Sequence, residues 1–181
     1  GEFRDRNLVV IQRNPTSGSG RGAKQLLNLI RKLRRLNYRV RLFGSRDRLD
    51  QFVKGSAVQE QLRCLVAAGG DGTVAGLVSR HPQFPIATLP LGTENLMARY
   101  LQVPRSGNFV AQMIHTLETQ SFDTAFANDQ RFLLMTSVGV DAKVVQRLHA
   151  VRTGHIRRLS YVKPILQSFL GYNFPALSVY S

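Results

Sequence analysis

Residues 62–73 read LRCLVAAGGDGT, an apolar run that ends in a glycine-rich loop. The run at 62–68 has the length and composition of a buried strand, and a short helix is predicted from about residue 74 to residue 80. Adjacent glycines let the backbone approach a ligand closely, and a helix start offers free amides to phosphate oxygens. An aspartate in such a loop repels phosphate unless a cation intervenes, so Asp71 implies Mg²⁺, a hydroxyl partner or proton transfer. The alternative is a tight turn that Asp71 caps.

Two further loops repeat this strand–loop–helix order. One is Asn14-Pro15-Thr16-Ser17-Gly18, after the apolar run at 8–11, and the other is Pro90-Leu91-Gly92-Thr93-Glu94-Asn95, after the run at 86–89. Open α/β sheets bind ligands at the carboxyl ends of their strands, so the three loops are expected to meet at one edge. The sequence therefore predicts a nucleotide phosphate site at this edge.

Strands and helices alternate along the first two thirds of the chain, which predicts an α/β fold with a parallel sheet covered on both faces. The expected strands are 8–11, 38–42, 62–68 and 86–89, and the expected helices are 26–36, 49–53, 74–80, 94–101 and 108–117. From about residue 121 the pattern changes to a β-hairpin, 122–127 and 131–140, around the turn Asn128-Asp129. We expect a nucleotide-binding α/β domain over 1–120 and the truncated beginning of a second, β-rich domain over 121–181.

The chain of 181 residues carries a net charge of +14, from 25 Lys and Arg against 11 Asp and Glu. This excess attracts phosphates of a nucleotide, a nucleic acid or an anionic lipid, although a solvated helix face explains the basic cluster at 31–41 equally well. Aromatic-interleaved RNA-binding motifs are absent, so nucleic acid is an unlikely partner. The single cysteine, Cys64, excludes a disulfide framework within the chain and a cysteine-built metal site. The apolar runs are too short to span a membrane, and Gly1-Glu2-Phe3 is typical of a tag remnant rather than a signal peptide, so a cytoplasmic protein is expected.

The three loops resemble, in order and spacing, those of the diacylglycerol kinase catalytic domain family, which includes sphingosine, ceramide and bacterial lipid kinases. The resemblance continues through Arg131-Phe132-Leu133 and Gly139-Val140-Asp141-Ala142. It implies an N-terminal Rossmann-like domain of the NAD kinase and diacylglycerol kinase type, followed by a β-sandwich domain, with the nucleotide between them. It also implies transfer of the γ-phosphoryl group of ATP, with Mg²⁺, to a hydroxyl of a diacylglycerol- or sphingoid-type lipid.

The resemblance also assigns roles to individual residues. Asp71 would order Mg²⁺-bound water or the acceptor hydroxyl, Thr93 would hydrogen-bond the nucleotide, and Asn95 would brace its loop. Apart from the resemblance, Asp141 lies just past the predicted hairpin, where it would either position substrate or cap a turn. The other residues expected to line the nucleotide site are Asn14, Pro15, Thr16, Ser17, Gly18, Gly69, Gly70, Gly72, Thr73, Val74 and Ala75. The resemblance places the family's general base and most of its structural Mg²⁺ ligands beyond Ser181, so no metal ligand is assigned and this piece alone is expected to be inactive.

The chain departs from the family pattern at two places. Ala75-Gly76 stand where the family usually has Asn-Glu, and Asn95-Leu96 stand where it often has Asn-Asp. These departures concern the identity of the lipid rather than ATP binding.

Two other functions stay open. One is an NAD kinase-like enzyme, which shares the GGDGT loop, and the other is a non-catalytic nucleotide- or nucleic-acid-binding module with the same fold. The positive charge further predicts peripheral attachment to an anionic membrane surface. Whether the protein forms a homodimer stays open.

Overall fold

The computed structural model describes residues 3–14, 21–135 and 142. The chain divides into two compact units, Gly1–Leu134 and Met135–Ser181. Nearly all of the second unit lies outside the described residues, so the β-sandwich and the domain boundary expected near residue 121 stay predictions.

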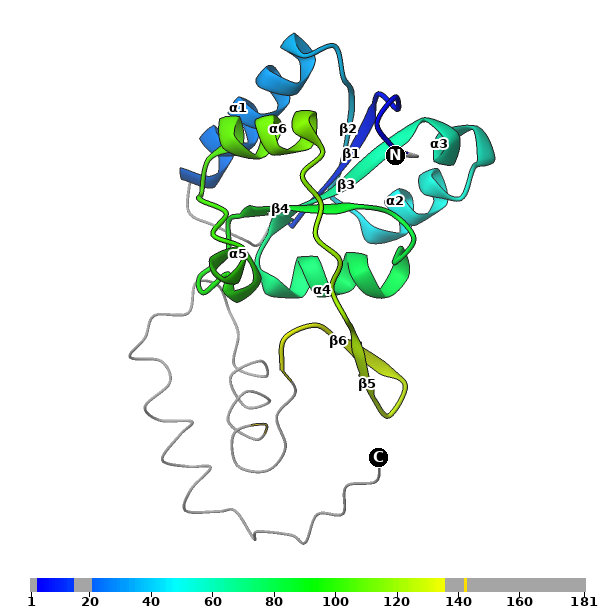
Figure 1. Cartoon of the computed structure of the whole chain (residues 1–181), viewed down its shortest axis with the longest axis vertical. Coiled ribbons are helices and arrows are strands. Elements are labelled where there is room, and N and C mark those ends of the chain that lie inside the picture. Colours follow the sequence, from blue (N-terminus) through cyan, green and yellow to red (C-terminus); the bar gives the residue numbers. More distant parts are fainter. Residues whose placement is uncertain (1–2, 15–20, 136–141, 143–181) are drawn as a thin grey trace, which may run out of the picture. The chain divides into compact units, whose positions relative to one another are not determined.

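A four-stranded parallel sheet forms the centre of the first unit, in the order β2-β1-β3-β4 (Figure 1). The strands are β1 (Leu8–Arg13), β2 (Arg39–Phe43), β3 (Leu62–Gly69) and β4 (Ile86–Pro90). Every residue of β3 is buried, because this strand has a neighbour on each edge and helices on both faces. The α/β class and all four predicted strands are confirmed.

Successive side chains of β1 enter two separate cores, as the period of a strand requires. Val9 and Ile11 join the core beneath α1 (Arg21–Arg35) and α6 (Gly107–Thr116). Leu8 and Val10 join the core beneath α2 (Arg46–Val53) and α4 (Asp71–Arg80). The two pairs of helices cover opposite faces of the sheet (Figure 1).

Helix α4 begins at Asp71, three residues before the predicted start. Gly70, in extended backbone (φ −97°, ψ −170°), is its N-cap residue. The negative charge of Asp71 in the first turn interacts favourably with the positive end of the helix dipole. The prediction was wrong here because three of the five GGDGT residues belong to the helix rather than to the loop.

Two short helices also differ from the prediction. Helix α5 (Leu96–Tyr100) is shorter than the expected 94–101, because Asn95 takes a left-handed backbone conformation. Helix α3 (Ser56–Gln61) was not predicted, since none of its side chains is buried and its sequence has no apolar period. Within the part of the chain that the structure describes, no helix is long and apolar enough to cross a membrane.

The predicted hairpin is present but short, with β5 (Ala125–Ala127) paired antiparallel to β6 (Gln130–Phe132). The turn residues Asn128 and Asp129 both have positive φ, 46° and 62°, as the common two-residue hairpin turns require. Residues 133–135 are not a strand, and 136–140 lie outside the described residues.

Candidate functional site

The loops that follow β3 and β4 meet at the carboxyl edge of the sheet, where β1 also ends beside them at Asn14. The Gly69 carbonyl accepts hydrogen bonds from the amides of Leu91 (2.9 Å) and Gly92 (3.3 Å), and the Asn14 amide donates to Ala68 O (3.2 Å). Main-chain hydrogen bonds therefore tie the GGDGT loop directly to the loop that carries Thr93.

Gly70 and Gly92 pack backbone against backbone. A Cβ on Gly92 would lie 2.6 Å from the Gly70 Cα, and a Cβ on Gly70 would lie 3.3 Å from the Gly92 Cα. Glycine is required at position 92, because a Cβ there would overlap the main chain of Gly70, whereas a Cβ at position 70 would need the Gly92 main chain to shift by a few tenths of an ångström.

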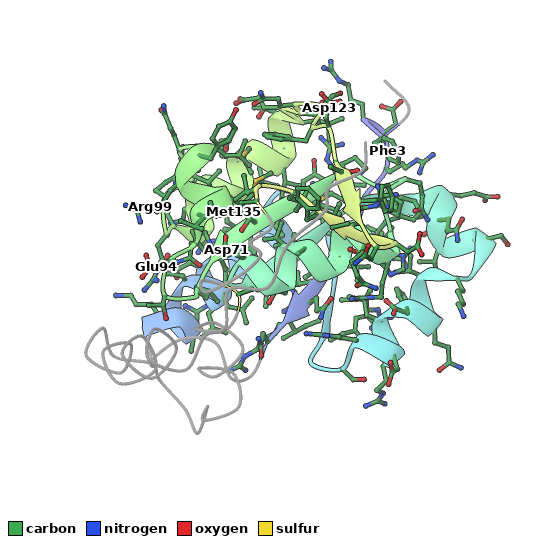
Figure 2. The ribbon with its side chains drawn as sticks, turned by 90° about the horizontal axis from the view of Figure 1, so that it is seen from below. Phe3, Asp71, Glu94, Arg99, Asp123 and Met135 are labelled. Atoms are coloured by element: carbon green, nitrogen blue, oxygen red, sulfur yellow. The ribbon has the colours of Figure 1, made fainter. Side chains whose placement is uncertain are left out.

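Side chains brace the same two loops. The Asn95 carboxamide bonds to both main-chain groups of Gly92, with Oδ1 accepting from the amide and Nδ2 donating to the carbonyl, each at 2.9 Å. Asp71 Oδ1 accepts from the amide of Met97, in the first turn of α5, at 3.0 Å. Asp71, at the start of α4, and Glu94, in the loop after β4, lie on the same side of the ribbon (Figure 2). The carboxylate predicted to act in the chemistry thus also fixes α5 against the start of α4.

Thr73 differs from the expected phosphate ligand, because its side chain is buried and packs against Gly69, where a Cβ would lie 2.9 Å from the Thr73 Cβ. The amides of Thr73 and Val74 both donate to the Gly70 carbonyl, at 2.9 and 3.3 Å. The amides of Asp71 and Gly72 are therefore the donors that the start of α4 can offer to an anion. A Cβ on Gly72 would meet none of the described residues within 4 Å, so packing within the described part of the chain does not require glycine there.

The described residues bring together Asn14, residues 69–73 and residues 92–95. Asn14 is half-buried at the end of β1, Thr93 is exposed, Val74 is buried inside α4, and Ala75 is half-buried. Pro15, Thr16, Ser17, Gly18 and Asp141 lie outside the described residues, and their assigned roles stay predictions.

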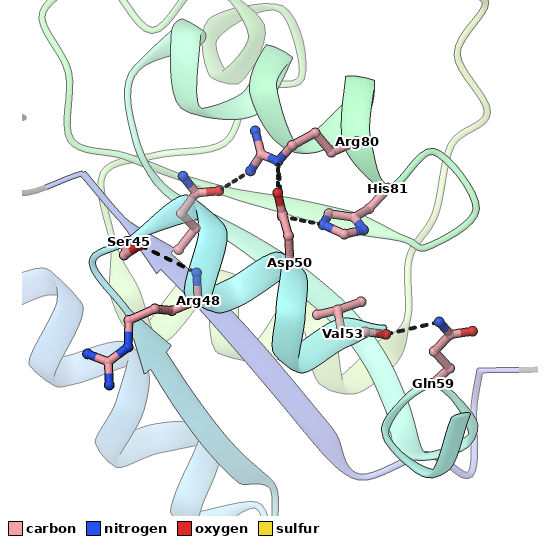
Figure 3. A network of polar contacts seen from close by, with 8 residues as sticks. Ser45, Arg48, Asp50, Val53, Gln59, Arg80 and His81 are labelled. Carbon is pink, nitrogen blue, oxygen red and sulfur yellow. Dashed lines mark hydrogen bonds and ion pairs between the residues drawn. The ribbon is translucent and has the colours of Figure 1, made fainter. Parts of the chain in front are cut away.

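A partly buried polar network that links β1, α2 and the end of α4 was missed by the sequence analysis (Figure 3). Arg80 Nη2 donates to Gln12 Oε1 at 2.8 Å, Arg80 Nε bonds to the Asp50 carboxylate at 2.9–3.0 Å, and His81 Nε2 lies 2.7 Å from Asp50 Oδ1. Burial raises the pKa of Asp50, but the hydrogen bonds and charges of His81 and Arg80 outweigh it and hold that pKa below its usual value. The signal was Gln12, a polar residue two positions after Val10 on the same inward face of β1.

The arrangement suits phosphate and a hard cation better than a dedicated metal centre. Among residues 3–14, 21–135 and 142, no group of three His, Cys, Asp or Glu side chains could hold a metal ion. One carboxylate beside free helix amides instead matches Mg²⁺ that is bound largely by substrate phosphates and water. The chain is thus an α/β domain with a parallel sheet, and its braced glycine loops lie at the carboxyl edge, where such sheets commonly bind ligands.

Comparison with known proteins gives the family. The family model of the diacylglycerol kinase catalytic domain matches residues 7–127, and the chain belongs to this family. The match contains the four-stranded sheet and all the described residues of the site.

Relatives and solved structures agree with this membership. A diacylglycerol kinase of Staphylococcus carnosus is 27% identical over 139 residues, which are 74% of this chain and 45% of that protein. One of Staphylococcus aureus is 26% identical over the same length. A crystal structure of a diacylglycerol kinase from Bacillus anthracis has the same fold, with a TM-score of 0.53 and 23% identity over 71% of this chain and 49% of that one. The chain spans about half the length of these proteins.

Proposed function

We propose that this chain is the nucleotide-binding part of an ATP-dependent lipid kinase, which transfers the γ-phosphoryl group of ATP to a hydroxyl of a diacylglycerol- or sphingoid-type lipid. The observation that supports it best is the pair of mutually braced glycine loops beside the start of α4, in a chain of the diacylglycerol kinase family. The acceptor lipid would be phosphorylated at an anionic membrane surface, to which the basic protein attaches peripherally.

The residues present fit a polyphosphate with Mg²⁺. As glycines, Gly70 and Gly92 place no side chain in the way of phosphate oxygens, and the space beside Gly72, which no described residue fills, would let such a group approach the amides of the first turn of α4. Bound ATP·Mg²⁺ would supply the phosphoryl group to be transferred. The protein contributes position and charge neutralisation, which are the main demands of phosphoryl transfer.

Asp71 would have two tasks. Its Oδ1 accepts from the Met97 amide and so fixes the carboxylate in place. In the proposed complex the carboxylate orders Mg²⁺-bound water or the acceptor hydroxyl, while Thr93 and residues 14–18 contact the nucleotide. Asp141 positions the lipid, and the general base is supplied by residues beyond Ser181, so the 181-residue piece binds ATP without turning it over.

Nucleotide binding by this chain tests the proposal, with isothermal titration calorimetry and thermal shift as the measurements. A Gly72→Ala variant places a methyl group where none of the described residues has an atom within 4 Å and where the ligand would lie. We expect it to abolish ATP·Mg²⁺ binding while leaving the melting temperature of the free protein unchanged. Gly55→Ala is the matched control, because its Cβ would make only ordinary 3.7 Å contacts between α2 and α3.

Binding of NAD or short RNA, with none of ATP·Mg²⁺, would contradict the kinase proposal. Equal ATP affinity of the Gly72→Ala and unsubstituted chains would place the nucleotide elsewhere. A longer chain that includes the residues after Ser181 should then phosphorylate diacylglycerol or a sphingoid base in anionic vesicles, and an Asp71→Asn variant of it should not.

A further inference from the structure

Arg105 stands ten residues beyond Asn95, the last residue predicted for the nucleotide site, yet its guanidinium bonds to the loop that carries Thr93. Nε donates to the carbonyl of Pro90 at 2.9 Å, and Nη2 donates to the carbonyl of Gly92 at 2.7 Å. The planar guanidinium fork can hold two acceptors at once in a fixed geometry, which an ammonium group cannot do. These two carbonyls flank Leu91, whose amide bonds to Gly69 O, so the loop is fixed from both sides.

The main chain on both sides of Arg105 is itself well anchored. Val103 is buried, and its amide donates to Ala98 O at 2.8 Å. Ser106 caps α6, with its Oγ accepting from the Phe109 amide at 3.3 Å. The Arg105 guanidinium therefore connects the Thr93 loop to a segment, residues 103–106, that is itself held by hydrogen bonds to α5 and α6.

Helix α6 is in turn packed tightly on α1. A Cβ on Gly107 would lie 2.5 Å from the amide nitrogen of Leu29, and the Gly107 amide donates to Gln25 Oε1 at 3.0 Å. Two carbonyl contacts thus link the candidate nucleotide loop to the pair of helices that covers one face of the sheet.

We propose that Arg105 is a positioning residue for the nucleotide: it holds residues 91–95 in the arrangement in which Thr93 and the Gly70–Gly92 contact receive the phosphates. This inference rests on the proposed function. Without the guanidinium, the loop spends only part of its time in the binding arrangement, and the apparent Kd rises in inverse proportion to that fraction. Losing two charge-assisted hydrogen bonds at a partly exposed site is expected to weaken ATP binding about tenfold, or about 1.4 kcal/mol.

Two substitutions separate positioning from simple charge attraction. Arg105→Lys keeps the positive charge but cannot reproduce the two-carbonyl contact, and Arg105→Ala removes both. If Arg105 acts through the loop, both variants of the 181-residue chain lose ATP·Mg²⁺ affinity about tenfold. Full affinity in Arg105→Lys would overturn the proposal, because charge alone would then suffice.

Arg99→Ala is the matched control for the loss of a cation near the site. Arg99 is exposed, comes from α5 and pairs only loosely with Glu94, at 3.6 Å between Nη1 and Oε2. We expect its Kd for ATP·Mg²⁺ to stay within about twofold of the unsubstituted value. A loss equal to that of Arg105→Ala would assign the effect to net charge and overturn the proposal.

Amide hydrogen exchange gives a readout that needs no nucleotide. In Arg105→Lys the amides of Leu91 and Gly92 should exchange faster, while those of Val10 and Leu65 in the sheet should keep their rates. Unchanged exchange at Leu91 and Gly92 would overturn the loop contact itself. Faster exchange with unchanged ATP affinity would overturn its link to the nucleotide. If the unsubstituted chain does not bind ATP·Mg²⁺, both the proposed function and the nucleotide role of Arg105 are refuted. The exchange rates of Leu91 and Gly92 then still decide whether Arg105 holds the loop.

Discussion

Arg63 gives the sharpest test of what stabilises this fold. It lies in β3 with 2% of its surface exposed, and no carboxylate among the described residues pairs with it. Its guanidinium instead donates to four carbonyl oxygens: Ile114 at 2.8 Å, His115 at 2.7 Å, Phe3 at 3.2 Å, and Arg4. Two of these carbonyls belong to the last turn of α6, whose negative dipole end favours a cation.

Substitution of Arg63 by methionine keeps most of the side-chain volume and removes all four donors. The carbonyls of Phe3 and Arg4 lie on the N-terminal segment and can turn toward water, whereas those at the end of α6 lose their donors near the core. Each buried carbonyl left without a partner costs about 1–3 kcal/mol, and part of that is offset because a charge no longer has to be buried. We expect Arg63→Met to lower the free energy of unfolding by about 3 kcal/mol, or roughly 10 °C in melting temperature.

Urea unfolding followed by circular dichroism measures this loss, read from the midpoint at constant m-value. The free energy of unfolding of Arg63→Lys should lie between that of the unsubstituted chain and that of Arg63→Met, because an ammonium group reaches fewer carbonyls than a guanidinium does. Arg34→Met, on the exposed side of α1, is the control and should change stability by less than about 0.5 kcal/mol. If Arg63→Met lowers the free energy of unfolding by no more than Arg34→Met does, the reasoning is refuted. The four hydrogen bonds would then only compensate for the cost of burying the charge.

Three further predictions follow from single contacts. Because hydrogen bonds hold the pKa of folded Asp50 below its ordinary value, its contribution to stability is present above about pH 4 and is lost as the pH falls through the folded-state pKa. Asp50→Asn should therefore flatten the acid limb of a stability-versus-pH curve, and an unchanged limb would contradict this. Burial raises the pKa of the Cys64 thiol to about 12, so a thiol reagent at neutral pH should label it only at the rate of global unfolding; faster labelling would show local opening of β3. A Cβ at Gly92 would lie 2.6 Å from the Gly70 Cα, so Gly92→Ala should destabilise the first unit by about 1–3 kcal/mol in urea unfolding, whereas Gly55→Ala should not.

Local sequence determined the order of strands and helices and the positions of the three loops. The reason is that periods of two and of 3.6 residues, and the glycines that end them, act over short distances along the chain. Strands β1, β3 and β4 were predicted to within two residues at each end, and the rule that parallel sheets bind ligands at their carboxyl edges brought residues 69–73 and 92–95 together correctly.

The tertiary structure alone decided how the site is held. Arg63 bonds to carbonyls more than fifty residues away in both directions along the chain, and Gln12 meets Arg80 across 68 residues. Asp71 accepts from Met97 across 26 residues, where the backbones of Gly70 and Gly92 pack together, and Asn95, in a left-handed conformation, makes two bonds to Gly92. Such contacts leave no periodic signal in the sequence. From the sequence alone, a polar side chain could equally lie on a solvated surface or bond to a distant partner, and only the packing of distant segments places that partner beside it.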